Sequence, residues 1–377
     1  SGYQVHGVDI DQDVVEAVNA GRVHISEPDL ERLVRAAVNS GRLTAGCELV
    51  RSDIFIICVP TPLLALDDSI PSPDLNYVMG VAEILPDNLE PGNLVILEST
   101  SPVGTTNAIQ TSISARIDVD LINIAYCPER VLPGCIVNEL IKNDRVVGGI
   151  TVEATAAAAA FYRTFVKGMV LETDAKTAEM CKLVENSFRD INIAFANELS
   201  MLCTNESINV WELINLANRH PRVSILSPGV GVGGHCIAVD PWFIVSRDPD
   251  NSKLIQTART VNKAKTAWVV KEIMHRSAST EISLGRKPQV GCLGLTFKPD
   301  VEDLRESAAL EVLRALSAED NLKVVAVEPN LKVEYVDGVR LSNLDRVIND
   351  SDIIVILVKH KEFIESEIRQ RLEKRVV

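Results

Sequence analysis

The chain has 377 residues, a formal net charge of −14 at pH 7 and an isoelectric point near 5.0. This length predicts two or three domains, each with its own core. The negative charge argues against nucleic acid or an anionic membrane surface as the main partner. Apolar runs such as IFIICV at 54–59 are too short to span a membrane, and the first residues lack the basic and apolar parts of a signal peptide. We therefore predict a cytoplasmic protein.

The eight cysteines form no CxxC pair. Without a secretory signal we expect reduced thiols, and we expect most of them to be small core residues. His235 and Cys236 are neighbours, but no second pair follows at ligand spacing, so we expect no metal site.

The first 150 residues alternate apolar segments with helical ones. The opening segment, YQVHGVDID, reads as a buried parallel strand that ends in the acid Asp9, and a helix follows at 11–20. Further strands are expected at 52–62, 92–105, 122–134 and 144–150. Strands that alternate with helices predict βαβ units and a parallel sheet.

The middle of the chain changes character at Thr151. Helices are expected from 151 onward and at 173–204, 210–220 and 253–276, which makes this part an all-helical block. After a linker at 285–288 the first pattern returns, with strands at 289–297, 322–330 and 351–360 and a helix at 307–318. The prediction is therefore an α/β protein with two doubly wound parallel-sheet domains that flank a helical middle.

A dinucleotide-binding domain normally opens with a strand, a G-x-G-x-x-G loop and a helix, and its second strand ends in an acid that binds ribose. This sequence opens on what resembles that second strand, so Asp9 is the candidate ribose acid. We expect the first strand and its glycine loop to be absent from this chain.

The segment GVGVGGHCIAVDP at 229–241 places glycines before Cys236 and an aspartate, Asp240, after it. A nucleophilic thiol needs room for its substrate and a nearby positive charge or helix N-terminus. The glycines would supply that room and expose backbone N–H donors. A cysteine after glycines is also compatible with a structural role.

Lys182, Asn186 and Arg189 follow at helical spacing and form one polar stripe. Such a stripe is either a solvated face or a lysine and an amide at an active site. Lys298 and the segments 98–105 and 125–134 fall at strand ends, where α/β domains bind ligands, although each is also compatible with an ordinary polar loop.

Six motifs in this order resemble the UDP-glucose/GDP-mannose dehydrogenase family: VPTP, ESTSPVGT, AYCPERVLPG, AEMCKLVENSFRDINIAFANEL, GVGGHCIAVDP and GLTFKPDVEDLRES. The resemblance covers essentially the whole chain. It implies a Rossmann-like NAD-binding domain at 1–165, a central helical dimerisation domain at 166–280 and a Rossmann-like UDP-sugar domain at 281–377. It also implies a homodimer or higher homo-oligomer. The stretch from NRHPRV to DPWFIV is typical of members that oxidise UDP-N-acetyl-D-mannosamine.

The resemblance also implies roles for individual residues. The implied catalytic residues are Cys236 as nucleophile, Lys182 and Asn186 at the oxyanion, Asp240, Glu129 and Thr100. The implied cofactor contacts are Asp9, Pro60, Thr61, Thr100 and Arg305. The implied substrate contacts are Glu129, Arg130, Val131, Lys182, Asn186, Arg189, His220, Arg222, Gly233 and Lys298.

The implied reaction is a four-electron, NAD-dependent oxidation of a sugar C6 alcohol, through a cysteine thiohemiacetal and a thioester. UDP-N-acetylglucosamine, UDP-N-acetylgalactosamine and UDP-glucose are alternative substrates. A two-electron dehydrogenase of similar architecture, such as a 6-phosphogluconate-type enzyme, and a non-catalytic UDP-sugar-binding protein are alternative functions.

Overall fold

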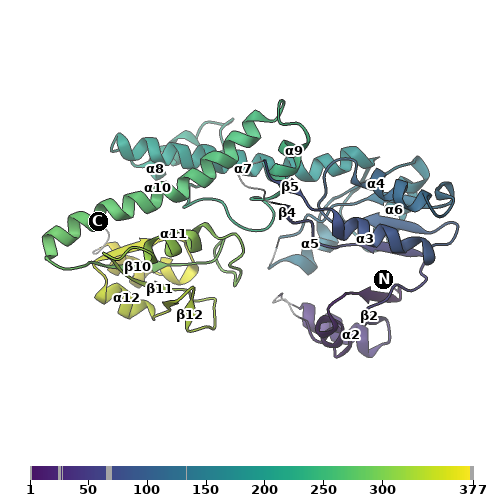
Figure 1. The fold of residues 1–377 in the computed structure, drawn as a ribbon, viewed down its shortest axis with the longest axis horizontal. Coiled ribbons are helices and arrows are strands. Elements are labelled where there is room, and N and C mark those ends of the chain that lie inside the picture. The colour runs from purple at the N-terminus through teal and green to yellow at the C-terminus, as the bar shows by residue number, and fades with distance from the viewer. Residues whose placement is uncertain (1, 24–26, 28, 65–69, 133, 374–377) are drawn as a thin grey trace. The chain divides into compact units, whose positions relative to one another are not determined.

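The computed structural model describes residues 2–23, 27, 29–64, 70–132 and 134–373. The chain divides into two compact units, Ser1–Val184 and Glu185–Val377, which are described separately (Figure 1). No helix within the described residues is long and apolar enough to cross a membrane.

The N-terminal unit is built on a five-stranded sheet. Its strands lie in the order β3 (Ile54–Ile57), β6 (Leu94–Leu97), β7 (Asn123–Tyr126), β8 (Arg145–Gly149) and β9 (Val170–Asp174). Parallel pairing joins all neighbours except β7 and β8, which are antiparallel. The predicted parallel sheet is therefore confirmed, with this one antiparallel pair as an exception. β9 also interrupts the segment that we expected to be wholly helical.

Helices cover both faces of this sheet. Val95 and Leu97 of β6 point into a core shared with α3 (Asn76–Ile84) and α4 (Thr105–Ser114). Leu94 and Ile96 point into a second core, shared with α6 (Val152–Tyr162). Successive side chains of a strand face opposite sides of the sheet. All four residues of β6 are apolar and buried, so the strand is covered on both faces. The doubly wound arrangement follows from this pattern.

The opening strand is less buried than predicted. β1 (Val5–Val8) pairs in parallel with β2 (Leu43–Gly46), and α1 (Gln12–Asn19) begins after the N-cap Asp11. Val5 is 53% exposed and Val8 is 42% exposed. The prediction of a buried strand is wrong because β1 and β2 form a two-stranded sheet that is separate from the five-stranded one. The remaining elements of this unit are α2 (Leu30–Asn39), β4 (Leu63–Leu64), β5 (Ser72–Pro73) and α5 (Ile136–Lys142).

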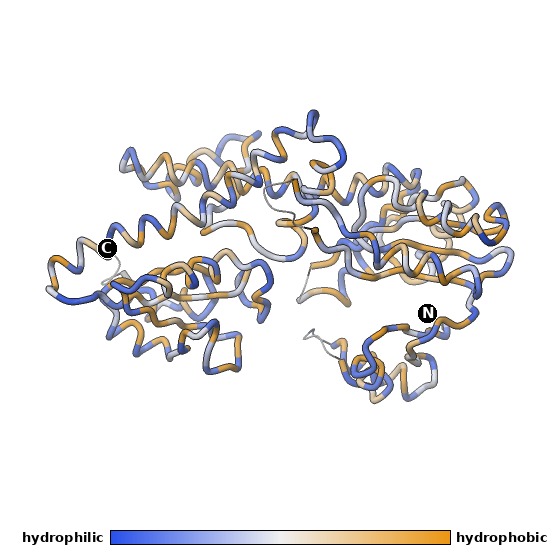
Figure 2. Tube along the Cα trace, viewed as in Figure 1, coloured by the Kyte–Doolittle hydropathy of each residue, from blue (hydrophilic) through white to orange (hydrophobic). Residues whose placement is uncertain are grey.

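The second unit begins within a long helix, α7 (Ala175–Asn205), and continues with α8 (Val210–Ala217), α9 (Asp240–Arg247) and α10 (Lys253–Leu284). Figure 2 shows both hydrophilic and hydrophobic residues along α10, which continues beyond the end predicted for it at 276. The helix α9 was not predicted. Asp240, singled out only for its chemistry, is its first residue.

A second parallel sheet ends the unit, in the order β11 (Lys323–Val327), β10 (Gln289–Leu293) and β14 (Ile353–Ile356). α11 (Ala308–Ser317) begins at the N-cap Ser307, whose hydroxyl accepts a hydrogen bond from the Leu310 amide. This strand–helix–strand order confirms the return of the α/β pattern. The shorter elements here are β12 (Tyr335–Val336), β13 (Val339–Arg340), α12 (Leu344–Asp350), α13 (Lys361–Ile364) and α14 (Ser366–Glu373).

All eight cysteines are free thiols, but only Cys127, Cys203 and Cys292 are buried. The expectation that most are core residues is therefore wrong. Burial raises the pKa of the Cys127 and Cys292 thiols to about 12, so both remain neutral at physiological pH. Cys236 is partly exposed.

Candidate functional site

Titratable side chains gather at the carboxyl edge of the five-stranded sheet. Cys58, Glu98 and Cys127 directly follow the last residues of β3, β6 and β7. Arg145 begins β8, which runs antiparallel to β7, so its side chain belongs to the same edge. Ligands of open α/β sheets bind at this edge.

Glu98 is held by three neighbours at this edge. The Tyr162 hydroxyl donates to Oε1, the Cys58 thiol lies 3.6 Å from Oε2, and Arg145 Nη1 lies 3.9 Å from Oε1. Burial raises the pKa of the Glu98 carboxyl, while the Tyr162 hydrogen bond and the Arg145 charge oppose that rise. Sequence reasoning did not single out Glu98, although it lies within the ESTSPVGT motif.

Arg145 joins Glu98 to the predicted residue Glu129. The Arg145 side chain is 3% exposed, and its Nη2 lies 3.0 Å from Oε2 of Glu129. The other oxygen of Glu129 accepts hydrogen bonds from the amides of Arg130 at 2.6 Å and Val131 at 2.8 Å. Three predicted substrate residues thus meet at one carboxylate. Sequence reasoning did not single out Arg145. The pattern that could have indicated it is a charged residue directly before the apolar run VVGGI.

Two predicted cofactor residues also lie together. The Thr61 hydroxyl, which follows Pro60, donates to the Thr100 carbonyl at 2.6 Å. The fully buried Glu179 accepts hydrogen bonds from the amides of Gly104 at 2.5 Å and Thr106 at 2.8 Å, at the start of α4. A carboxylate at a helix N-terminus satisfies unpaired N–H groups and complements the helix dipole. Glu179 thereby anchors the loop that carries Thr100.

Asp9 has the surroundings expected of a ribose acid. It directly follows β1, it is exposed, and its Oδ1 accepts one hydrogen bond from the Asp11 amide at 2.9 Å. An exposed carboxylate at this position can accept hydrogen bonds from ribose hydroxyls. Asp9 is therefore compatible with a ribose contact of a dinucleotide.

In the second unit, a buried polar network holds the start of the glycine segment. The Asn197 side chain accepts a hydrogen bond from the Gly229 amide at 2.8 Å and donates one to Asn262 at 2.9 Å. Asn262 in turn donates to Asp190 at 2.8 Å, and Arg259 donates to the same carboxylate at 2.7 Å. The helices α7 and α10 thus define where the segment begins.

Two glycines of this segment pack closely against another part of the same chain. A Cβ on Gly233 would lie 2.1 Å from the Glu306 carbonyl oxygen, and one on Gly234 would lie 2.7 Å from the Phe297 ring. Gly234 also has a φ of +86°, which favours glycine. The space that we expected to be open for a ligand is occupied on this side by the loop after β10, so these glycines allow two chain segments to pack closely.

Cys236 lies in a turn that leads into α9. Its carbonyl accepts hydrogen bonds from the amides of Val239 at 3.0 Å and Asp240 at 2.8 Å. Asp240 is buried, and its Oδ2 accepts a hydrogen bond from Asn186 Nδ2 at 2.5 Å. Three predicted catalytic residues are therefore placed together by α7 and α9.

Arg305 supplies positive charge to the same turn. It pairs with Asp303 at 2.7 Å, and this pair together with the nearby Cys236 raises the pKa of the guanidinium. His235 Nδ1 lies 3.9 Å from Asp303 Oδ2, the same oxygen that pairs with Arg305. A cation beside a thiol favours the thiolate. Arg305, expected as a cofactor contact, is therefore also placed to act on Cys236.

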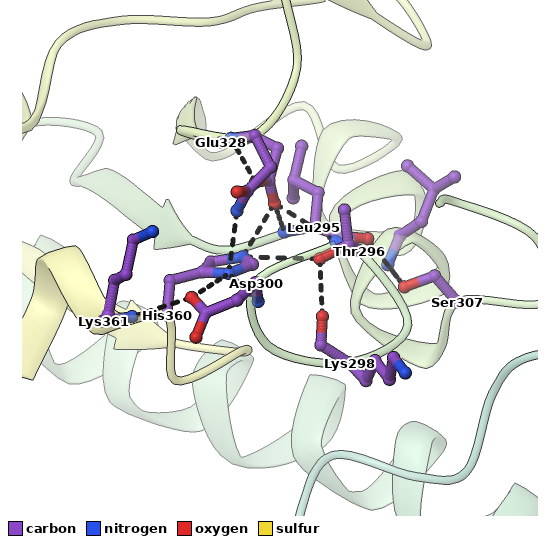
Figure 3. Close-up of polar contacts among 10 residues, drawn as sticks. Leu295, Thr296, Lys298, Asp300, Ser307, Glu328, His360 and Lys361 are labelled. Atoms are coloured by element: carbon purple, nitrogen blue, oxygen red, sulfur yellow. Dashed lines mark hydrogen bonds and ion pairs between the residues drawn. The ribbon is translucent and has the colours of Figure 1, made fainter. Parts of the chain in front are cut away.

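The other predicted residues are distributed as follows. Lys182 is half-buried on α7, one turn before Asn186, whereas Arg189 on the same helix is exposed. His220 and Arg222 are exposed, and the His220 ring accepts a hydrogen bond from the Arg222 amide at 3.3 Å. Lys298 is half-buried in the loop after β10, with its carbonyl bound by the Thr296 hydroxyl at 3.0 Å (Figure 3). Among the described residues no three His, Cys, Asp or Glu side chains are grouped as metal ligands.

Three family models match the chain in succession. They describe the NAD-binding domain at residues 1–166, the central domain at 176–264 and the UDP-binding domain at 291–377 of the UDP-glucose/GDP-mannose dehydrogenase family.

Individual relatives match over nearly the whole chain. An NDP-N-acetyl-D-galactosaminuronic acid dehydrogenase from Ralstonia nicotianae is 48% identical over 99% of this chain and 89% of its own length. A UDP-N-acetyl-D-mannosamine dehydrogenase from Escherichia coli is 47% identical over 96% and 89%. The solved structure of a UDP-D-ManNAc dehydrogenase from Pyrococcus horikoshii covers 100% of this chain and 88% of its own, at 36% identity and a TM-score of 0.86. The chain therefore belongs to the UDP-glucose/GDP-mannose dehydrogenase family and is an NAD-dependent dehydrogenase of UDP-sugars.

Proposed function

We propose that the protein oxidises the C6 alcohol of a UDP-N-acetylhexosamine, with UDP-N-acetyl-D-mannosamine as the leading candidate, to the corresponding uronate. The mannosamine assignment is supported by the relative from E. coli and the structure from P. horikoshii. UDP-N-acetyl-D-galactosamine is the second candidate, because the relative from R. nicotianae, which is named for N-acetyl-D-galactosaminuronic acid, is 48% identical.

The reaction requires the loss of two hydrides, which NAD accepts when it is bound in the N-terminal domain. The first oxidation removes a hydride and a proton from the C6 alcohol and leaves an aldehyde. The Cys236 sulfur then adds to the aldehyde carbon as a thiohemiacetal, so the reactive aldehyde is retained. The second oxidation gives a thioester, and water cleaves its C–S bond to release the carboxylate and restore the thiol.

The surroundings of Cys236 carry this proposal. The Arg305 guanidinium favours the thiolate that forms the adduct, and Asn186 and Lys182 are the donors that we assign to the oxyanions. Asp240, which is buried and accepts the Asn186 amide hydrogen bond, orients that amide and is our candidate for proton transfer.

We assign thioester hydrolysis to Glu129, with Thr100 positioning the water. The two amide donors and the Arg145 charge hold the Glu129 carboxylate in one orientation. A carboxylate oriented in this way can direct a water molecule toward an acyl carbon. Arg145 then acts as a positioning residue for Glu129.

We also propose that the central helices form a homodimer interface. Phe188, Phe195 and Leu202 lie at seven-residue intervals along α7 and are 65%, 50% and 55% exposed. Three large apolar side chains on one helix face indicate a surface that a partner covers. A second copy of the chain presents the same stripe, which suits a two-fold interface.

The test is the amount of NADH formed per UDP-N-acetyl-D-mannosamine consumed, with wild-type protein and Cys236→Ser. We expect two NADH in the wild type and an arrested second oxidation in the variant. Two NADH from UDP-N-acetyl-D-galactosamine alone would retain the mechanism and change the substrate. One NADH, or a variant as active as wild type, would contradict the thioester mechanism and favour a two-electron enzyme. UDP-sugar binding with no NADH at all would indicate a non-catalytic binding protein.

A further inference from the structure

The loop between β10 and α11 adopts a costly backbone conformation around Lys298. Asp300 has a φ of +60° and Glu306 a φ of +50°, although both carry a Cβ. Non-glycine residues hold such angles only where the surrounding structure fixes them, and they concentrate at functional sites. The contacts that fix Asp300 therefore determine where Lys298 is held.

Glu328 lies at the centre of those contacts. It directly follows β11 and is 5% exposed. Its Oε2 accepts hydrogen bonds from the amides of Leu295 at 2.6 Å and Thr296 at 3.2 Å, and its Oε1 accepts two from Asn330, at 3.0 Å from the amide and 3.2 Å from the side chain. In a nucleotide-binding domain the acid at this topological position binds ribose. Here its oxygens bind the protein instead, in contrast to the exposed Asp9.

His360 links Glu328 to Asp300 (Figure 3). The ring is fully buried, and its Nε2 lies 3.0 Å from Oε2 of Glu328. Its Nδ1 faces two donors, the Asp300 amide at 2.9 Å and the Asn330 side-chain nitrogen at 3.0 Å. A nitrogen that accepts hydrogen bonds carries no proton, so the proton lies on Nε2 and points at Glu328.

Two further contacts complete the support. The Asp300 Oδ1 accepts a hydrogen bond from the Lys361 amide at 3.0 Å. The same oxygen lies 3.8 Å from His360 Nδ1, the nitrogen that already accepts the two hydrogen bonds described above. On the other side of Lys298, the Thr296 hydroxyl donates to the Lys298 carbonyl, and this hydroxyl also lies 3.4 Å from His360 Nε2. The backbone is therefore anchored on both sides of Lys298.

We propose that His360 and Glu328 are positioning residues for the nucleoside diphosphate part of the substrate. Neither touches the ligand. They hold the loop at 295–300 in its strained form and so present the Lys298 ammonium to the diphosphate. This proposal rests on the proposed function, because it takes Lys298 as a substrate contact.

The experiment measures the dissociation constants of UDP and of NAD by calorimetry with the full chain. His360→Leu removes both ring nitrogens, and His360→Asn keeps an acceptor that can reach the Asp300 amide. We expect His360→Leu to weaken UDP binding about tenfold or more, which corresponds to about 1.4 kcal/mol. We expect His360→Asn to recover part of that loss. NAD binding should remain as in wild type in both variants.

His275→Leu is the matched control, since His275 is exposed on α10, and it should bind UDP as wild type does. UDP binding by His360→Leu equal to wild type would overturn the positioning role alone. If wild-type protein does not bind UDP, the proposed function fails together with this inference.

A measurement on the wild type does not depend on whether the variants fold. Nitrogen NMR of protein labelled in its six histidines reports which ring nitrogen carries the proton. We expect one buried ring protonated at Nε2, with Nδ1 accepting hydrogen bonds. A proton on Nδ1 of His360 would contradict the arrangement.

Discussion

The side-chain amide of Asn186 donates a 2.5 Å hydrogen bond to the buried carboxylate of Asp240, across 54 positions of sequence. One residue comes from the middle of α7 and the other from the first turn of α9. The bond therefore links the helix that carries the Lys182–Asn186 stripe to the turn that carries Cys236.

Replacing Asp240 with asparagine tests this link. The variant keeps the shape but removes the negative charge that orients the Asn186 amide, so we expect kcat to fall about 10- to 1000-fold. KM for the UDP-sugar should change less than kcat. The measurement is steady-state NADH formation. A normal kcat in Asp240→Asn would assign this carboxylate to capping α9 instead of catalysis.

The glycines before Cys236 offer a comparison within one segment. Gly233→Ala places a Cβ 2.1 Å from the Glu306 carbonyl, so either the loop after β10 or the Cys236 turn must move. We expect loss of most activity and a lower melting temperature. Gly229→Ala is the control, because its Cβ would lie 3.8 Å from the nearest heavy atom, the Gly231 carbonyl oxygen. Equal activity in the two variants would show that the close approach at Gly233 has no functional consequence.

The half-buried Glu98 and the buried Glu328 should affect stability with opposite dependence on pH. Burial raises the pKa of Glu98, so its favourable contribution is present at low pH and is lost as the pH rises through the folded-state pKa. Burial alone would also raise the pKa of Glu328, but hydrogen bonds from His360 and from the Leu295 and Asn330 amides lower it. Its contribution is therefore present above the ordinary pKa and is lost as the pH falls through the folded-state value.

The test is urea unfolding of wild type, Glu98→Gln and Glu328→Gln from about pH 3 to pH 8, because the contribution of Glu328 changes below the ordinary glutamate pKa and that of Glu98 above it. The stability of Glu98→Gln relative to wild type should rise as the pH rises above the ordinary glutamate pKa, and that of Glu328→Gln should fall as the pH rises from about 3 toward that value. Each unit of pKa displacement corresponds to about 1.4 kcal/mol. Parallel pH profiles of the two variants would contradict the opposite environments found for these carboxyls.

The stripe on α7 predicts the effect of a charge on oligomeric state. Phe195→Glu places a carboxylate in the middle of Phe188, Phe195 and Leu202 and should convert a dimer to a monomer. Light scattering after size-exclusion chromatography gives the mass of each species. Lys263→Glu, at an exposed position of α10, changes charge outside the stripe and should leave the mass unchanged. A wild-type protein that is already monomeric would rule out this interface.

Local patterns in the sequence determined the elements and much of the candidate site. Apolar runs with turn residues at their ends predicted β3, β6 and β7, and uninterrupted helical spacing placed Lys182 and Asn186 one turn apart on α7. These features depend on residues close together in the chain, so a single sequence reveals them.

Only the tertiary structure decided which distant residues meet. It paired β7 with an antiparallel β8, and this pairing places Arg145 beside Glu129. It also filled the space next to Gly233 with the Glu306 carbonyl and joined His360 to Glu328 across 32 positions. Neither apolar periodicity nor turn chemistry encodes such contacts, because each depends on how whole elements pack and on which buried polar groups must find partners.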